Sequence, residues 1–560
     1  MKHKYASMVG GLKPRRNKFD LSYRKIFDCN MGELIPVVCD EAIPGDHWSI
    51  GNELVVRFQP MVRPIMHEIQ ATVHYFFVPY RILWRKWEDY IAQGDLDGST
   101  PLPLVLPRPT GAIANQLAAP YTLWDYFGLP LSVGSTVGNN PLTPIDMPWR
   151  AYWKIYNEYY RDPDIQEDVW HDGDLQDNYN ITNFLARRNW RKDYFTSSRP
   201  ARQRGQAPAL PVNVQMQYSQ AGGSVPANVQ YLQWFNGING QGNLSNINAV
   251  DYNGSFSQQL RNASTSIDAG SAAGISIRDM LPKLISNSPN QTGIYATSTT
   301  FNVSDLRLSF QVQKWLERNM RASTRYTSFL RAHFGVSPRD DRLDRPEYIG
   351  GTKMPVIVSE VLQTSQNTTD SELGDYAGHG IAADGQHAGN YNIQEFGIVM
   401  GLLSIMPKPG YQQGINRQWL RYSPIDFYFP EFAHLSEQAI YTSEIYHDPA
   451  NVNDQNRLPF GYQGVYDEMR VKYDQACGTL RTLPDRWIGQ KPLYQSQDYW
   501  HLMNWYSQAP VLNSEFISCD PRTNIWHVTD VPNLIVNCQN NLFVTRPLPA
   551  IAEPGYVDHF

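Results

Sequence analysis

The sequence predicts a mainly β protein whose strands are joined by long insertions that contain several helices. Apolar and polar side chains alternate with a period of two in 69–77, and apolar-rich runs follow at 395–409 and 534–547, as expected for strands that line a core. The chain of 560 residues holds 39 Pro and 39 Gly, which fits a fold with many turns and connections. A chain of this length can bury a large core, and all-β folds of this size often form one domain.

Three segments are predicted as strands. The alternation in 69–77 predicts a strand with one buried face. The run at 395–409 predicts a more fully buried strand that stops at Pro407, because proline has no N–H group for the ladder. The run at 534–547, LIVNCQNNLFVTRP, predicts a hairpin.

Three further segments are predicted as amphipathic helices with an aromatic face. The first spans 149–160 and ends before Pro163, the second begins near Ser304, and the third stops at Gly335. Their apolar faces consist of Trp149, Tyr152, Trp153, Tyr156 and Tyr160, of Leu306, Phe310 and Trp315, and of Tyr326, Phe329, Leu330, His333 and Phe334. We interpret these faces as packing surfaces.

Two insertions differ in composition from the rest of the chain. Residues 203–300 are rich in Gly, Ser, Asn and Gln and carry few charges, and 367–390 have the same character. Such segments cannot bury much apolar area by themselves. Because long insertions in compact folds often carry function, we expect 203–300 to form a variable surface insertion and 367–390 a smaller variable loop.

The charge distribution limits contact with nucleic acid to local regions. The net charge is −6, so the surface as a whole is not a polycation. Residues 1–18 carry only basic charges, which predicts either a solvated terminus or an inward-facing arm that contacts nucleic acid or neighbouring subunits. The basic residues of the arm nearest the first strands are Lys13, Arg15, Arg16 and Lys18.

Basic and aromatic residues also interleave in 186–205. The candidate contacts there are Arg187, Arg188, Trp190, Arg191 and Lys192. These residues could hold a single nucleic acid strand by stacking and charge. Alternatively, the arginines pair with acidic neighbours across a subunit contact, and we favour this second interpretation.

The motifs of common enzymes and metal sites are missing. Five cysteines without C-x-x-C spacing indicate neither a disulfide framework nor a zinc site. His67 and His74 are seven residues apart, which places them on opposite faces of a strand. Asp340, Asp341 and Asp344 alternate with arginines, which favours charge pairing over a cation site. We predict no catalytic residue, no metal site and no cofactor.

The chain also lacks an apolar stretch long enough to span a bilayer, and its N-terminal segment lacks the apolar core of an export signal. We therefore expect neither membrane insertion nor export.

Several sequence blocks together resemble a known family. FDLSY, CNMGELIPV and a PGD turn are followed by PMVRPIMHEIQATVHYFFVPYRILW, TRYTSFLRAHFGV, RPEYIGG, GYQQGINRQW and the C-terminal PGYVDHF. In this order, from 19 to 560, they are similar to the major capsid proteins of gokushoviruses, the small icosahedral single-stranded DNA bacteriophages of the Microviridae. The resemblance is weakest inside the insertion at 203–300.

The resemblance implies an eight-stranded antiparallel jelly roll, the viral capsid β-barrel, spanning 19–560 after the basic arm 1–18. It implies a T=1 icosahedral shell of sixty copies around a circular single-stranded DNA genome, assembled in the cytoplasm of a bacterial host. The implied partners are further copies of the chain, an internal scaffolding protein, a DNA pilot protein and a host surface receptor. The insertion at 203–300 would form the protrusion at the three-fold axes and contact the host, with Trp234, Phe235, Tyr252 and Phe256 as candidate contacts.

Two other classes remain open from the sequence. A secreted carbohydrate-binding or hydrolytic jelly roll would share the strands and exposed aromatic residues, but we expect it to show an export signal and, if hydrolytic, two convergent carboxylates. A single-stranded DNA-binding protein would share the basic segments, but the acidic balance of the chain argues against it.

Overall fold

The computed structural model describes residues 15–61, 67–92, 117–131, 144–169, 182–208, 213–218, 294–300, 303–359, 379–411, 413–435, 437–447, 452–478, 511–521, 525–528 and 531–551. The chain divides into two compact units, Met1–Gln206 with Lys314–Phe560, and Ala207–Gln313. Within the described ranges no helix is long and apolar enough to cross a membrane.

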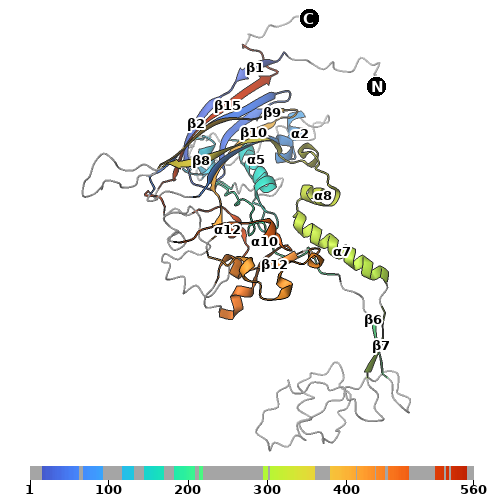
Figure 1. The fold of residues 1–560 in the computed structure, drawn as a ribbon. Coiled ribbons are helices and arrows are strands. Elements are labelled where there is room, and N and C mark those ends of the chain that lie inside the picture. Colours follow the sequence, from blue (N-terminus) through green and yellow to red (C-terminus); the bar gives the residue numbers. More distant parts are fainter. Residues whose placement is uncertain are drawn as a thin grey trace, which may run out of the picture. The chain divides into compact units, whose positions relative to one another are not determined.

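The first unit is built on a mainly antiparallel sheet, which confirms the mainly β prediction (Figure 1). Nine strands of the described chain form it: β1 (Asn17–Asp20), β2 (Tyr23–Cys29), β3 (Ile35–Ala42), β4 (His47–Phe58), β5 (Ile69–Pro79), β8 (Glu347–Ser359), β9 (His379–Asn392), β10 (Gly397–Pro407) and β15 (Leu534–Arg546). Their order is β1-β15-β4-β9-β8-β5-β10-β3, and β2 also pairs with β15.

The centre of the sheet is buried on both faces. β5 and β10 pair along their whole length, from Gly397 opposite Pro79 to Pro407 opposite Ile69. All eleven residues of β10 are buried, which confirms the fully buried strand that ends at Pro407. The prediction of one buried face for β5 is wrong, because ten of its eleven residues are buried. Its second face is covered by helices from elsewhere in the chain, which a period of two cannot reveal.

β15 is one continuous strand, so the predicted hairpin at 534–547 is wrong. It pairs with β4 from Leu534 opposite Phe58 to Thr545 opposite His47. On its other edge it pairs with β2 and then with β1. Asn540, where a turn was expected, is fully buried and donates from its side-chain amide to the Val37 carbonyl at 3.0 Å. Asn540 therefore pairs within the sheet and packs in the core instead of forming a turn.

Side chains join the two ends of the sheet. Lys25 of β2 donates from Nζ to the carbonyl of Pro36 on β3 at 2.7 Å and also to the carbonyl of Tyr126. Asn540 supplies a second bond to β3, as above. These bonds occupy carbonyl groups of β3, which ends the strand order of the sheet and has no further strand beside it among the described residues. Burial lowers the pKa of Lys25 to about 8.

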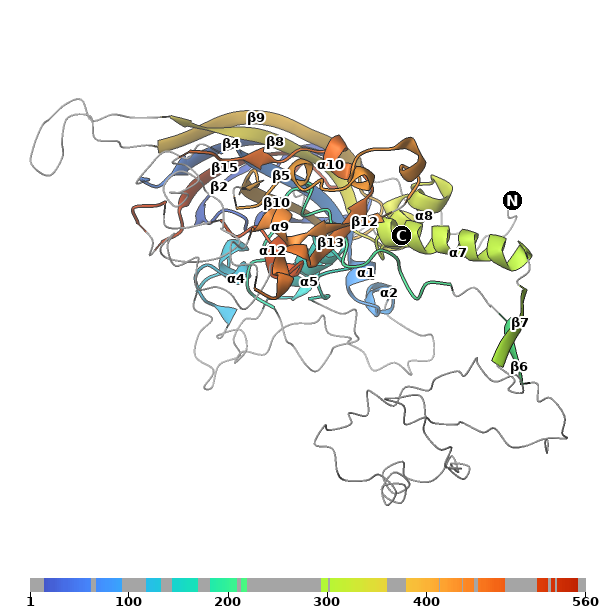
Figure 2. The same cartoon turned by 60° about the horizontal axis from the view of Figure 1, so that its bottom comes forward.

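A helical layer covers the outer face of β5, β10 and β3. It consists of α1 (Tyr80–Leu83), α2 (Trp87–Ala92), α4 (Leu123–Tyr126), α5 (Met147–Ile155) and the π-helix η1 (Tyr156–Tyr160). Figure 2 shows α1, α4 and α5 on one side of the sheet. Trp149, Tyr152 and Trp153 are buried against Phe76 and Met400. The prediction of an aromatic packing helix at 149–160 is confirmed.

The other two predicted helices form, but their aromatic faces are only partly covered by the subunit. α7 (Val303–Ala322) leaves Phe310 and Trp315 64% and 50% exposed. α8 (Tyr326–Phe334) contains no buried residue. It ends as predicted at Gly335, whose φ of 69° is readily adopted only by glycine. The prediction that these faces pack is therefore confirmed only in part. The rings of Phe329 and Trp315 lie 4.5 and 6.5 Å from the His333 ring, whereas other aromatic residues of the two faces stay exposed.

Short elements make up the remainder of the described first unit. They are η4 (Asp340–Leu343), β11 (Gly410–Tyr411), η5 (Arg417–Trp419), η6 (Pro424–Asp426), η7 (Pro430–Phe432), β12 (Glu437–Tyr441), α9 (Thr442–Ile445), η8 (Val452–Arg457), β13 (Pro459–Gly464), α10 (Asp467–Arg470), β14 (Asp474–Gln475) and α12 (Ser514–Ile517). Tyr194, Phe195 and Ile440 lie in the apolar cluster that holds them together.

The second unit contains an antiparallel pair, β6 (Asn213–Tyr218) and β7 (Ile294–Thr300), in which Asn213 lies opposite Thr300. This pair joins the two ends of the insertion expected at 203–300.

Candidate functional site

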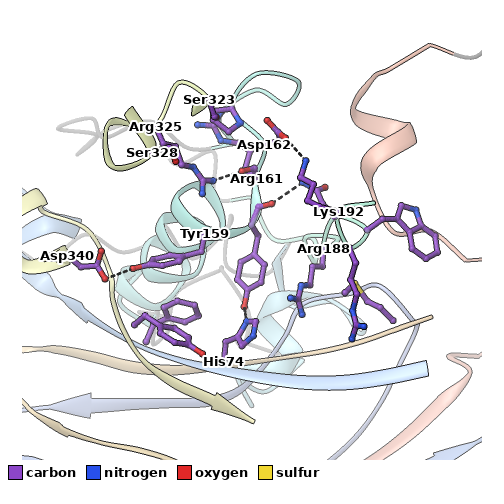
Figure 3. Close-up of a pocket in the computed structure, with 18 of the residues that line it drawn as sticks. His74, Tyr159, Arg161, Asp162, Arg188, Lys192, Ser323, Arg325, Ser328 and Asp340 are labelled. Carbon is purple, nitrogen blue, oxygen red and sulfur yellow. Dashed lines mark hydrogen bonds and ion pairs between the residues drawn. The ribbon is translucent and has the colours of Figure 1, made fainter. Parts of the chain in front are cut away.

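A cavity of about 710 Å³ lies in the first unit, between the sheet and the helical layer. β5 contributes His74 and Phe76, and η1 contributes Tyr159 and Tyr160. Further lining residues come from 161–163, 188–192, 323–328 and the start of β8. Figure 3 shows Arg161, Arg188 and Arg325 around the cavity. Segments that are far apart in the sequence therefore form this wall.

Basic side chains dominate the lining. Its cationic residues are Arg161, Arg188, Arg191, Lys192, Arg199 and Arg325. Its carboxylates are Asp162 and Asp340. Six positive charges against two negative charges leave the lining four charges positive. Such a surface favours an anion.

Half of these cations have carboxylate partners. Asp162 accepts from Lys192 at 2.7 Å and lies 3.5 Å from Arg199. Arg199 also pairs with Asp164 at 3.0 Å, and Arg161 pairs with Asp168. The pKa of Asp162 is lowered: burial would raise it, but Lys192 and Arg199 together outweigh burial.

The other three cations have no carboxylate partner among the described residues. Arg188 instead donates to the hydroxyl groups of Thr72 and Ser404, at 2.5 and 2.7 Å. Arg325 donates to the backbone carbonyls of Asn157, at 3.0 Å, and Arg161. Burial lowers the pKa of both guanidinium groups, and neighbouring arginines lower it further. A bound anion would relieve this unfavourable burial of charge.

The floor of the cavity is aromatic and neutral. His74 Nδ1 and the Tyr160 hydroxyl are 2.8 Å apart, and their rings stack at 5.9 Å. Burial lowers the pKa of His74 to about 4, and the charge of Arg188 adds to this. Arg188 also lies over the Tyr160 ring at 5.5 Å. Flat rings beside guanidinium groups suit a ligand that carries both a planar group and negative charge.

One donor in the lining is buried without an acceptor in the described chain. This is Nε of Arg161. An unpaired buried donor is costly, so it would be stabilised by an acceptor from outside. Guanidinium groups stay protonated at neutral pH and only donate. The arginines of the described lining are therefore suited to binding an anion.

The structure places four of the five candidate nucleic-acid contacts in 186–205 at the cavity. Arg188, Trp190, Arg191 and Lys192 line the cavity, whereas Arg187 lies outside its lining and pairs with Asp520. The two aromatic residues that follow, Tyr194 and Phe195, are buried in the small apolar cluster and cannot stack on a ligand. Arg187, Lys192 and Arg199 pair with carboxylates of their own chain, and pairing of the segment across a subunit contact stays a prediction.

Sequence reasoning missed Arg161, Arg199 and Arg325. Each lies in a different segment from Arg188, and the fold brings them together. No local pattern marks Arg161 or Arg325, because the cavity is created by long-range packing. Arg199 lay inside the basic segment 186–205 but was not singled out.

The structure describes three of the four candidate residues of the basic arm and none of the candidate host contacts in the insertion. Lys13 lies outside the described residues, while Arg15 and Arg16 precede β1. Lys18 belongs to β1 itself and lies over the Phe543 ring at 4.8 Å. The candidate host contacts lie outside the described residues: Trp234, Phe235, Tyr252 and Phe256.

The acidic residues near 340 form ion pairs, as predicted. Asp341 pairs with Arg339 at 2.9 Å, and Asp340 lies 3.5 Å from Arg345. Asp344 pairs with Arg81 at 2.5 Å instead of with a neighbour in sequence. Among the described residues, no group of three or more His, Cys, Asp or Glu is arranged to hold a metal ion.

Comparison with known proteins connects this fold to virus shells. The family model described as Capsid protein (F protein) matches residues 7–556. The chain is 32% identical to Capsid protein VP1 of Chlamydia phage 1, with 97% of this chain and 96% of the relative covered. It is 29% identical to Capsid protein VP1 of Bdellovibrio phage phiMH2K, covering 100% and 98%, and 28% identical to that of Spiroplasma virus 4, covering 98% and 97%.

These matches extend over the whole chain, so they apply to the sheet, the helical layer and the insertions together. They decide between a shell subunit and the alternative classes that the sequence left open. The chain belongs to the capsid protein (F protein) family and is a gokushovirus-like major capsid protein, a self-assembling structural component of the virion.

Proposed function

We propose that sixty copies of the chain form a T=1 icosahedral shell around a circular single-stranded DNA genome. The large sheet would be the eight-stranded jelly roll of this shell, with β1 as an additional short edge strand. Support comes from the side-chain bonds of Lys25 and Asn540 to the end strand β3, because a protected end strand is less open to fibril-like strand addition. The chain would act by mutual fit and perform no bond chemistry.

The observation that carries the genome proposal is the basic cavity. Arg188, Arg191 and Arg325 would bind phosphate, and the half-buried ring of Trp190 would contact a base. Proteins that bind single strands without sequence preference combine these two features. The overall charge of −6 then matters little, because the positive charge is concentrated where the strand binds.

This contact can be tested with one matched pair of variants. Arg191→Gln removes a cation that has no carboxylate partner in the described chain, whereas Arg187→Gln removes one that pairs with Asp520 outside the cavity. Affinity of the full chain for a single-stranded oligonucleotide would be measured at several salt concentrations. We expect Arg191→Gln to reduce the slope of log K against log salt by about 0.7, the value for one phosphate contact.

Arg187→Gln should leave that slope unchanged. Equal slopes for Arg191→Gln and the parent, or a loss in Arg187→Gln alone, would contradict the cavity as the genome contact.

The N-terminal arm is a second candidate contact with the genome. We infer that Lys13, Arg15 and Arg16 face the shell interior together with Lys18. Replacing all four by neutral residues should lower the DNA content or the stability of particles. Particles with full DNA content and unchanged stability would remove this role.

The insertion at 203–300 is the candidate host-facing element, with Trp234, Phe235, Tyr252 and Phe256 as contacts. Shortening it should spare shell assembly and lower attachment to the host. Loss of assembly with attachment intact would count against this role. An internal scaffolding protein and a DNA pilot protein would be the phage partners during assembly in the host cytoplasm.

A further inference from the structure

Residues 417–435 form an exposed surface that we call the aromatic ledge. Within 17 residues it presents seven large apolar side chains, with exposed fractions from 43% at Phe429 to 81% at Tyr422. These side chains are Trp419, Tyr422, Ile425, Phe427, Tyr428, Phe429 and Leu435. A soluble monomer rarely leaves so many large apolar residues together in water.

The two arginines of the ledge pair with buried carboxylates beneath its apolar side chains. Arg417 donates to Glu444 at 3.1 Å, and Arg421 donates to Glu468 at 3.3 Å. The two glutamate side chains are only 1% and 7% exposed. The buried ion pairs therefore lie beneath an exposed apolar layer.

Local hydrogen bonds fix the backbone of the ledge. Asn416 accepts from the Gln418 N–H at the start of η5, and Asp426 accepts from the N–H groups of Tyr422 and Ser423 at 3.0 and 2.8 Å. The Tyr466 hydroxyl donates to the Phe427 carbonyl at 3.2 Å. The aromatic side chains thus project from a backbone that is ordered before any partner arrives, which reduces the entropy cost of binding.

The exposed area matches what a stable contact requires. If each side chain offers roughly 200 Å² when fully exposed, the seven expose on the order of 800 Å². A standard protein interface covers about 800 Å² on each partner. The aromatic residues that dominate the ledge are also those enriched at the centres of interfaces.

We propose that the aromatic ledge is a docking face for a second copy of this chain, and that α8 of the neighbour receives it. The inference rests on the proposed shell, in which each subunit meets identical copies. Contacts between two different faces repeat around a rotation axis and close into a ring.

α8 has the properties of such a receiving face. None of its residues is buried, and Tyr326 and Phe334 are 61% and 70% exposed. Arg331 on the same helix is exposed and has no ion-pair partner in the described chain. The ledge carries an exposed carboxylate at Glu431 that is likewise unpaired among the described residues. The two faces are therefore complementary in charge as well as in apolar character.

The experiment compares two isoleucines of matched exposure. Ile425 lies on the ledge and is 70% exposed, and Ile26 lies on β2 and is 67% exposed. Ile425→Arg and Ile26→Arg would be expressed with the internal scaffolding protein, and particle yield would be measured by sedimentation and electron microscopy. Thermal unfolding of the unassembled chain would report whether each variant folds.

We expect Ile425→Arg to unfold at the parent's temperature and to lose at least tenfold in particle yield, while Ile26→Arg assembles like the parent. Phe334→Ser on α8 should lose yield in the same way. Normal assembly of Ile425→Arg would overturn the ledge as a docking face, and normal assembly of Phe334→Ser would overturn α8 as its receiver. If the parent itself forms no particles, the proposed shell is wrong. Failure of the shell proposal can therefore be told apart from failure of the ledge proposal.

Discussion

β10 and the aromatic ledge are both rich in large apolar residues, yet they have opposite surroundings. All eleven residues of β10 are buried by the subunit itself, between the sheet core and the helical layer. In the ledge the large apolar side chains face solvent and the ion pairs lie underneath. The difference separates two uses of apolar surface: β10 holds one subunit together, whereas the ledge is available to hold one subunit to another.

The largest effect on subunit stability is expected beneath the ledge. Glu444→Ala removes the buried acceptor of Arg417 and of the Tyr194 hydroxyl. Because this leaves a poorly solvated charge without a partner, we expect a loss of about 4 kcal/mol in the free energy of unfolding. Urea unfolding of the unassembled chain would measure it. Glu431→Ala, on the exposed surface of the ledge, should change stability by about 0.5 kcal/mol or less.

A slightly smaller loss is expected in β10. Leu403 is fully buried in the sheet core, so Leu403→Ala should cost about 3 kcal/mol through lost burial and the cavity it leaves. Ile535 on β15 is 41% exposed, and Ile535→Ala should cost about 1 kcal/mol or less. Equal losses at the two positions in chemical denaturation would mean that the sheet core is not the stabilising element.

His74 on β5 should make the stability of the sheet depend on pH. Its pKa falls to about 4 on folding, from about 6.5 in an unfolded chain. Between these values the unfolded state binds more protons, so stability decreases as pH falls. From pH 7 to pH 5 the expected loss is about 2 kcal/mol. Unfolding measured at both pH values should show a smaller loss in His74→Gln; an identical loss would exclude His74 as the cause.

The smallest effect on the subunit is expected on the surface of the ledge. Tyr422 is 81% exposed, so Tyr422→Ala should change the free energy of unfolding by about 0.5 kcal/mol or less. Calorimetry of the unassembled chain would test this. A loss of several kcal/mol would mean that Tyr422 packs within its own subunit and is not held ready for a partner.

The sequence predicts well those elements whose surroundings follow from their own pattern. The strand ending at Pro407, the aromatic helix at 149–160 and the glycine stop at Gly335 were predicted correctly. Each of these signals is local: an apolar run, a helical spacing, or a residue that adopts a positive φ without strain.

Errors arose where a distant segment decides the outcome. The second face of β5 is buried because helices from 147–160 cover it, and β15 stays straight through Asn540 because this side chain bonds to β3. The aromatic faces of α7 and α8 look like packing faces in the sequence, but Phe310, Tyr326 and Phe334 remain exposed in the subunit. Periodicity identifies an apolar face without identifying what covers it.

The candidate site was predicted only in part for the same reason. The interleaved segment at 186–205 drew attention to Arg188 and Arg191, which do line the cavity. Arg161 and Arg325 lie in segments far from 186–205 in the sequence, and only folding places them beside the others. Arg187 looked equivalent to Arg188 in the sequence, yet its side chain pairs with Asp520 outside the cavity.

A cryo-electron microscopy reconstruction of particles formed by the chain tests the central claim most directly, because it reveals both the symmetry of the shell and the surroundings of the ledge. We expect a closed icosahedral shell of sixty copies in which a neighbouring copy covers Tyr422, Ile425 and Phe427 while the buried pair of Arg417 and Glu444 is unchanged. A closed shell in which these three side chains still face solvent, or a chain that stays monomeric with its scaffolding protein, would contradict the account.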